Sequence, residues 1–130
     1  MPDRAHLILF VRDQLAATRF YRLVLGREPV LDVPGMTEFE IGPAAVLGLM
    51  PERGITRLLG PAIDPAKAGG APRAELYLVV DDPGGHHARA LVAGARELSA
   101  LAPRDWGHEV AYSADLDGHI LAFARETGGG

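Results

Sequence analysis

Leucine and valine alternate with other residues in two similar segments of the chain. Residues 6–13 read HLILFVRD and residues 75–82 read ELYLVVDD, so the segments start 75 − 6 = 69 positions apart. Both fit the pattern X-Leu-x-Leu-x-Val-x-Asp, with four of the eight positions identical. Alternating β-formers predict a strand, and the final Asp is a good helix N-cap. Each segment therefore predicts a strand that leads into a helix.

The residues after each segment predict that helix. Pro83 follows the second Asp at the helical position that proline tolerates best, and Gly26 and Gly94 stand near the expected helix ends. Apolar residues recur at helical spacing in both stretches, so one buried face is expected on each helix. These faces consist of Ala16, Phe20, Leu23 and Val24 in the first helix, and Ala88, Leu91, Val92 and Ala95 in the second.

Three further strands are expected after each helix, with turn signals such as Pro34-Gly35 and Asp117-Gly118 between them. The expected strands cover 27–33, 36–42 and 44–50 after the first helix, and 97–102, 109–114 and 119–125 after the second. The sequence thus predicts an α+β fold of two β-α-β-β-β modules, each with a curved sheet and its helix outside.

We expect a single domain over residues 1–130. Module one covers 5–51, a linker covers 52–73, and module two covers 74–126. The linker is rich in Pro, Gly and Ala, and a short helical turn is expected at Ile55, Leu58 and Leu59. The tail Gly128-Gly129-Gly130 is expected to be disordered.

Strand alternation separates two faces of the sheets. The repeated residues Leu7, Leu9 and Val11, like Leu76, Leu78 and Val80, should pack on the helix of their own module. The other face carries His6, Ile8 and Phe10 in one copy, and Glu75, Tyr77 and Val79 in the other. The copies differ on that second face, so we expect it to border a shared cavity.

Composition narrows the class of partner. The net charge is −4 and the basic residues are scattered, which argues against nucleic acid and anionic membrane as partners. No apolar run approaches the roughly 20 residues that span a bilayer. Cysteine is absent, which excludes disulfides and thiolate ligands and favours a cytoplasmic location.

The chain resembles the vicinal oxygen chelate superfamily of glyoxalases, bleomycin resistance proteins and dioxygenases. Besides the opening segment, the resemblance rests on Phe20-Tyr21-Arg22 with Leu25-Gly26, and on Asp115-Leu-Asp-Gly-His-Ile-Leu-Ala. It implies a curved mixed sheet around a cavity, and a homodimer.

The resemblance also implies four metal-ligand positions, which fall on His6, Gly48, Glu75 and Ala122. Gly48 and Ala122 offer no ligating side chain, whereas catalytic zinc sites normally keep three protein ligands. The sequence therefore leaves undetermined whether the protein has a cofactor. A divalent metal would need water, a chelating substrate, or a further ligand such as His108 or Glu109.

Trp106-Gly107 with Glu109 resembles the antibiotic-binding branch of the superfamily, whose members lack the metal ligands. Trp106 is equally interpretable as a packed loop residue that covers the core. The expected ligand pocket comprises Phe10, Phe39, Gly48, Met50, Tyr77, Trp106, Glu109 and Ala122, with Gly48 and Ala122 leaving room for the ligand.

His6 and Glu75 allow three interpretations: a remnant metal site, a metal-free acid/base pair in which both are catalytic, or a structural polar pair. His86 and His87 are expected in solvent at a helix start, and His119 is expected to point away from the cavity.

The first functional hypothesis is a small-molecule-binding protein that sequesters an aromatic or antibiotic-like compound. The alternative is a glyoxalase-like lyase, isomerase or dioxygenase that uses a divalent metal or a metal-free acid/base pair. The sequence leaves open whether the protein is an enzyme.

Overall fold

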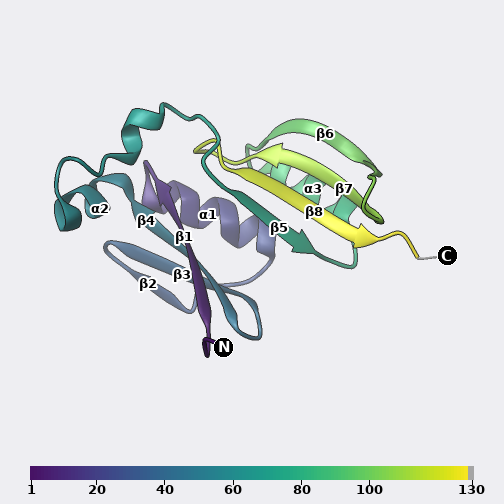
Figure 1. Cartoon of the computed structure of the whole chain (residues 1–130), viewed down its shortest axis with the longest axis horizontal. Helices are drawn as coiled ribbons and strands as arrows, with labels where there is room; N and C mark the ends of the chain where they lie inside the picture. The colour runs from purple at the N-terminus through teal and green to yellow at the C-terminus, as the bar shows by residue number, and fades with distance from the viewer. Residues whose placement is uncertain (129–130) are drawn as a thin grey trace. The chain divides into compact units, whose positions relative to one another are not determined.

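The computed structural model describes residues 1–128, so the expectation for Gly129 and Gly130 lies outside it. Two β-α-β-β-β units follow each other along the chain, as predicted (Figure 1). The first contains β1 (Ala5–Val11), α1 (Gln14–Leu25), β2 (Leu31–Val33), β3 (Met36–Gly42) and β4 (Ala45–Pro51). After α2 (Glu52–Leu59) and the 3₁₀ turn η1 (Pro65–Ala68), the second contains β5 (Glu75–Val79), α3 (Pro83–Val92), β6 (Arg96–Pro103), β7 (His108–Ala114) and β8 (Ile120–Glu126).

The two sheets have the same topology. Their strand orders are β1-β4-β3-β2 and β5-β8-β7-β6. In each sheet the first and last strands of the unit pair in parallel, and the other neighbours pair antiparallel. The α+β fold class and the internal repeat are therefore confirmed at the level of strand order.

The chain divides into two compact units. Met1–Arg22 and Gly26–Gly69 form the first, and Leu23–Leu25 belong with the residues from Gly70 onward in the second. No helix within residues 1–128 is long and apolar enough to cross a bilayer.

The expected helix caps are present. The carboxylate of Asp13 accepts the Ala16 N–H at 3.0 Å, and that of Asp82 accepts the Gly85 N–H at 3.0 Å. Gly26 ends α1 in the left-handed conformation with φ 66°, which glycine adopts without a steric penalty. Beyond α1, β2 is shorter than the predicted strand 27–33, because Pro29 has no N–H for the ladder and pairing begins only when Val30 donates to Glu38.

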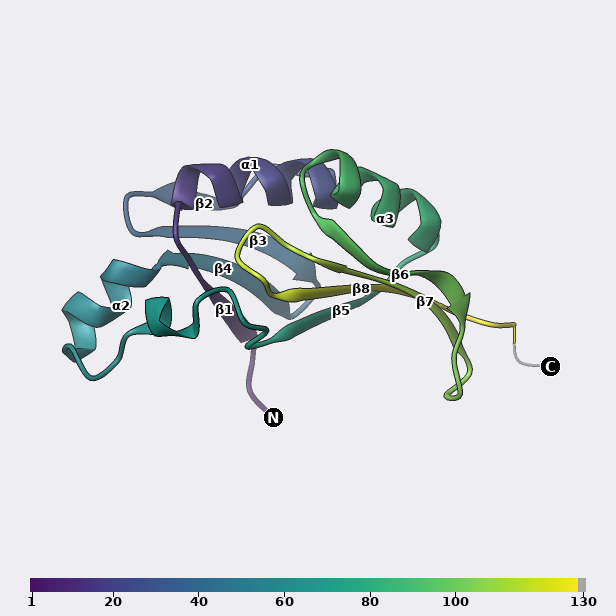
Figure 2. The same ribbon diagram turned by 90° about the horizontal axis from the view of Figure 1, so that it is seen from above.

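The core of the first unit lies between its sheet and α1, on the side that Figure 2 shows covered by that helix. The Thr18 hydroxyl on α1 lies 2.9 Å from that of Thr37 on β3. Leu9 and Thr37 both pair with Leu49, so they share a face, as expected for Leu9. The sheet residues of this core are at most 1% exposed: Leu9, Val11, Thr37, Phe39, Leu47 and Leu49.

The predicted buried face of the second helix is wrong. In α3 the buried residues are Pro83, His87 and Ala90, whereas Val92 is 83% exposed and Ala88 is exposed too. His87 also contradicts its expected place in solvent, because its Nε2 lies 2.9 Å from a carboxylate oxygen of Glu97 on β6. The buried face of α3 thus includes a hydrogen-bonded histidine, whereas the apolar pattern placed that face at Ala88 and Val92. In α1, similarly, Tyr21 is buried where Leu23 was expected.

The Asp-x-Asp-Gly element, residues 115–118, forms the turn before β8. One carboxylate oxygen of Asp115 accepts the backbone N–H groups of Asp117 and His119, both at 2.9 Å. Gly118 has φ 89°, and a Cβ there would overlap the carbonyl oxygen of Gly70. Glycine is therefore required twice over, by the backbone conformation and by the close approach of another segment.

Gly118→Ala should lower the free energy of unfolding by about 3 kcal/mol, since it adds a backbone overlap to the left-handed strain of about 1–2 kcal/mol. Urea denaturation followed by circular dichroism measures this. Gly107→Ala is the matched control, because Gly107 has φ 83° with nothing within 4 Å of its Cβ position. Equal losses in the two variants would contradict the close approach of Gly70.

Candidate functional site

Two tyrosines cover the middle of the second sheet on the face turned away from α3, called here the far face of the second sheet. Tyr77 on β5 and Tyr112 on β7 both pair with Ala122 on β8, so the three residues share that face. The neighbouring Phe123 points the other way and packs on His86 of α3, with ring centroids 5.5 Å apart. Ala122 is fully buried beneath the tyrosines. The space expected at Ala122 is therefore filled by aromatic rings.

A hydrogen-bonded chain holds an exposed tryptophan on this face. The indole Nε1 of Trp106 donates to the Tyr77 hydroxyl at 2.9 Å, and that hydroxyl lies 2.5 Å from Nδ1 of His108. The Tyr77 hydroxyl accepts from Trp106, and the tautomer of His108 sets the direction of its second hydrogen bond: the hydroxyl donates to a bare Nδ1 or accepts from an Nδ1–H. Trp106 nevertheless remains 56% exposed, so its ring is oriented yet accessible.

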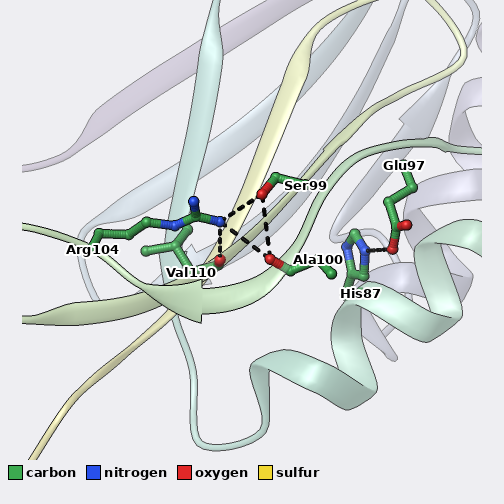
Figure 3. Close-up of polar contacts among 6 residues, drawn as sticks. All are labelled: His87, Glu97, Ser99, Ala100, Arg104 and Val110. Atoms are coloured by element: carbon green, nitrogen blue, oxygen red, sulfur yellow. Dashed lines mark hydrogen bonds and ion pairs between the residues drawn. The ribbon is translucent and has the colours of Figure 1, made fainter.

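Arg104 secures the start of the same loop, as Figure 3 shows. Its guanidinium donates to the Ser99 hydroxyl at 2.8 Å and to the carbonyls of Val110 at 2.7 Å and Ala100 at 3.2 Å. The guanidinium carbon also lies 5.1 Å from the ring centroid of Tyr112, a cation–π geometry. These contacts fix Arg104 between β6 and β7 and leave the tip of the loop to present Trp106.

The electrostatic environment keeps Tyr112 neutral. Burial raises the pKa of its hydroxyl, and the Glu75 carboxylate and Tyr77 raise it further, while Arg104 lowers it in part. Tyr112 is therefore a protonated hydroxyl on the far face at neutral pH. Glu75, at the start of β5, is exposed and acts on Tyr112 through its charge.

The far face of the first sheet, turned away from α1, carries a second polar pair. Nδ1 of His6 on β1 lies 3.3 Å from a carboxylate oxygen of Glu38 on β3, with the side chains 31% and 22% exposed. Glu38 and Ile8 both pair with Gly48 across the sheet, so the three share this face. A Cβ on Gly48 would overlap the tip of Ile8 and lie 3.2 Å from Met36 Sδ. The room expected at Gly48 is thus occupied by Ile8.

The sequence model of the Glyoxalase/Bleomycin resistance protein/Dioxygenase superfamily matches residues 4–123 of the chain. The chain belongs to this superfamily. No match was found among curated proteins.

Several solved structures share the fold. A glyoxalase-related enzyme from Fulvimarina pelagi is 24% identical, with a TM-score of 0.82 over 97% of this chain and 89% of its own. A glyoxalase/bleomycin resistance protein/dioxygenase family enzyme from Burkholderia phytofirmans PsJN is 17% identical, with a TM-score of 0.80 over 96% and 99%. TioX from Micromonospora sp. ML1 is 22% identical, with a TM-score of 0.66 over 96% and 99%. At these identities the likeness shows the fold alone.

The metal site that the superfamily implies does not fit the residues present. Gly48 and Ala122 provide no donor atom, and their surroundings are filled by Ile8 and by two tyrosines. In residues 1–128, no three His, Cys, Asp or Glu side chains gather closely enough to hold a metal ion. His6 has one acidic neighbour, Glu38, and two donors fall short of the three protein ligands of a catalytic zinc site.

Two expected pocket residues are placed elsewhere. Phe39 pairs with Leu47 and is fully buried in the core beside α1, because alternation from Glu38 turns it to the opposite face. Glu109 lies on the opposite face from Val110, where it forms an ion pair with Arg125. Both residues are therefore excluded from the far faces. Phe10 and Met50 pair with each other on the far face of the first sheet, at the end of β1 and β4.

Three residues of these faces were missed in the sequence: Glu38, Arg104 and Tyr112. Strand alternation could have found two of them, since Glu38 alternates with Thr37 and Phe39, and Tyr112 shares a face with Val110. Arg104 lies in a loop, where no periodicity applies, and its role depends on carbonyl groups that the fold brings together.

Proposed function

We propose that the protein binds a small aromatic or antibiotic-like compound on the far face of its second sheet. The observation that carries this proposal is the exposed ring of Trp106, hydrogen-bonded to Tyr77, which packs with Tyr112 on one apolar cluster. Aromatic surfaces held in one orientation bind planar ligands without losing side-chain entropy. A loop residue that only covered the core would bury its ring, and Trp106 does not.

The polar groups around these rings define the ligand further. Nε2 of His108 and the Tyr112 hydroxyl offer hydrogen-bonding groups, and Glu75 contributes negative charge at the start of β5. A planar, uncharged or cationic compound with acceptor groups suits this surface better than an anion. Membership of the superfamily supports the small-molecule class and leaves the compound to experiment.

Trp106 is the single tryptophan of the chain, so its fluorescence should report binding directly. Titration with bleomycin, as a first aromatic probe, should quench the emission saturably. By calorimetry, Trp106→Ala should weaken binding about tenfold or more, because a stacking anchor contributes about 1–3 kcal/mol. Tyr77→Phe should weaken it about threefold to tenfold, through loss of the hydrogen bond that orients Trp106.

Leu58→Ala is the control, since it truncates an apolar side chain that is 70% exposed on α2 of the first unit. It should leave the affinity unchanged. If the Trp106→Ala variant bound the compound with unchanged affinity, the ligand would bind elsewhere and the proposal would be overturned.

The second candidate is a metal-free acid/base catalyst, and the observation that favours it is the His6–Glu38 pair. A carboxylate beside one imidazole nitrogen orients the ring and leaves the other nitrogen to exchange a proton with a substrate. Glu38 is a partner on the same sheet, and the pairing of His6 with Glu75, which belongs to the other unit, stays a prediction. Glu75 keeps its proposed role as a base only if a substrate reaches β5.

Protein purified without chelator should carry far less than one equivalent of metal, and Ni, Mn, Fe or Zn should leave its melting temperature unchanged, because His6 and Glu38 supply too few donors. Elemental analysis measures the metal content, and thermal shift assays measure the melting temperature. Both are compared with those of the Glu38→Gln variant. Stoichiometric metal that is lost on His6→Ala would contradict the metal-free interpretation.

The homodimer and the cytoplasmic location remain predictions from the resemblance and from the absence of cysteine. The far faces described above belong to single units.

A further inference from the structure

Two unpaired arginines share one face of α2. Arg53 and Arg57 stand four positions apart on the helix, where side chains are neighbours and like charges repel. Neither guanidinium makes an ion pair or a side-chain hydrogen bond with any other residue from 1 to 128. Within the described chain, nothing compensates this repulsion.

A groove of about 640 Å³ contains both arginines. It lies among α2, the turn η1 and the ends of β1 and β4 in the first unit, and Arg12 adds a third guanidinium to its wall. The full lining is Arg12, Pro51, Glu52, Arg53, Thr56, Arg57, Asp64 and Ala66. A second groove of about 620 Å³ shares Arg12, Pro51 and Arg53 with the first, and it also contains Asp13 and Asp32, whereas Arg57 lines the first groove and not the second.

The carboxylates of the groove do not cancel this charge. Asp64 already accepts the Ala66 N–H at 3.1 Å as the cap of η1, and Glu52 forms no ion pair with Arg53 or Arg57. The guanidiniums of Arg53 and Arg57 thus have no acidic partner among residues 1–128 and place uncompensated positive charge in the groove, on a chain whose total charge is −4. A local positive site on an acidic protein selects small anions over polyanions, because the rest of the surface repels an extended negative partner.

We propose that this groove binds the phosphate group of a small phosphorylated molecule, with Arg53 and Arg57 as its ligands. A phosphate group carries nearly two negative charges and three terminal oxygens, so it can accept from two guanidinium forks at once. The planar fork of arginine suits such bidentate contacts. The groove leaves volume for an organic portion of the ligand. The site is independent of the aromatic surface on the second sheet.

Titration of the full-length protein with inorganic phosphate tests this, with the arginine Nε–H signals followed by NMR at constant ionic strength. The signals of Arg53 and Arg57 should shift saturably. Arg53→Gln and Arg57→Gln should each weaken phosphate binding about tenfold, the effect of losing charge-assisted hydrogen bonds. Arg19→Gln removes the same charge from an exposed position on α1 outside the groove and should change the affinity less than about twofold.

A parallel titration with succinate separates phosphate from carboxylate dianions. Clearly weaker binding of succinate supports a phosphate site. Equal affinity for succinate, an effect of Arg19→Gln as large as that of Arg53→Gln, or no saturation up to about 20 mM phosphate would each overturn the proposal.

Discussion

The parallel pairing of the first and last strands in each unit is the constraint on which both candidate surfaces depend. Pairing of β1 with β4 and of β5 with β8 fixes which residues lie opposite one another, and the two-residue period of a strand then assigns every side chain to one face. A slip of one position would exchange Leu9 with Ile8 and Leu76 with Tyr77. The buried leucines on the helix side therefore fix the position of the polar and aromatic residues on the far side.

This constraint explains what the sequence could predict. The alternation in residues 6–13 and 75–82 identified the helix-facing leucines and the far-face residues His6, Glu75 and Tyr77. The caps at Asp13 and Asp82 are local interactions, so they were visible as well. The same rule applied to β3 and β7 would have moved Phe39 and Glu109 off the pocket and brought in Glu38 and Tyr112.

Other features depend on contacts between distant segments, and no local pattern contains them. His87 is buried because Glu97 supplies a partner, which a helical apolar pattern cannot anticipate. The space at Gly48 depends on the side chain of Ile8, and the space at Ala122 depends on two tyrosines from neighbouring strands. At both positions where the resemblance implies a metal ligand, neighbouring side chains thus fill the space beside a small residue.

The same filling argues against the metal site that the resemblance to the superfamily implies. In the second unit, aromatic packing and a hydrogen-bonded chain occupy the region where a carboxylate ligand would stand. The hydrogen bonds that link Trp106, Tyr77 and His108 orient an exposed indole without burying it. Arg104 holds the start of the loop by donating to backbone carbonyls. The result is a preorganised aromatic surface, which is suited to binding a planar compound.

The central claim is that this hydrogen-bonded chain orients Trp106, and the tautomer of His108 tests it most directly. Long-range ¹H–¹⁵N NMR of the imidazole at mildly alkaline pH distinguishes the two ring nitrogens. The account predicts one fixed tautomer of His108, because its Nδ1 is hydrogen-bonded to the Tyr77 hydroxyl, with that pattern lost in Tyr77→Phe. The averaged signal of a freely exchanging ring in the unmodified protein, or a pattern unchanged in Tyr77→Phe, would contradict the account.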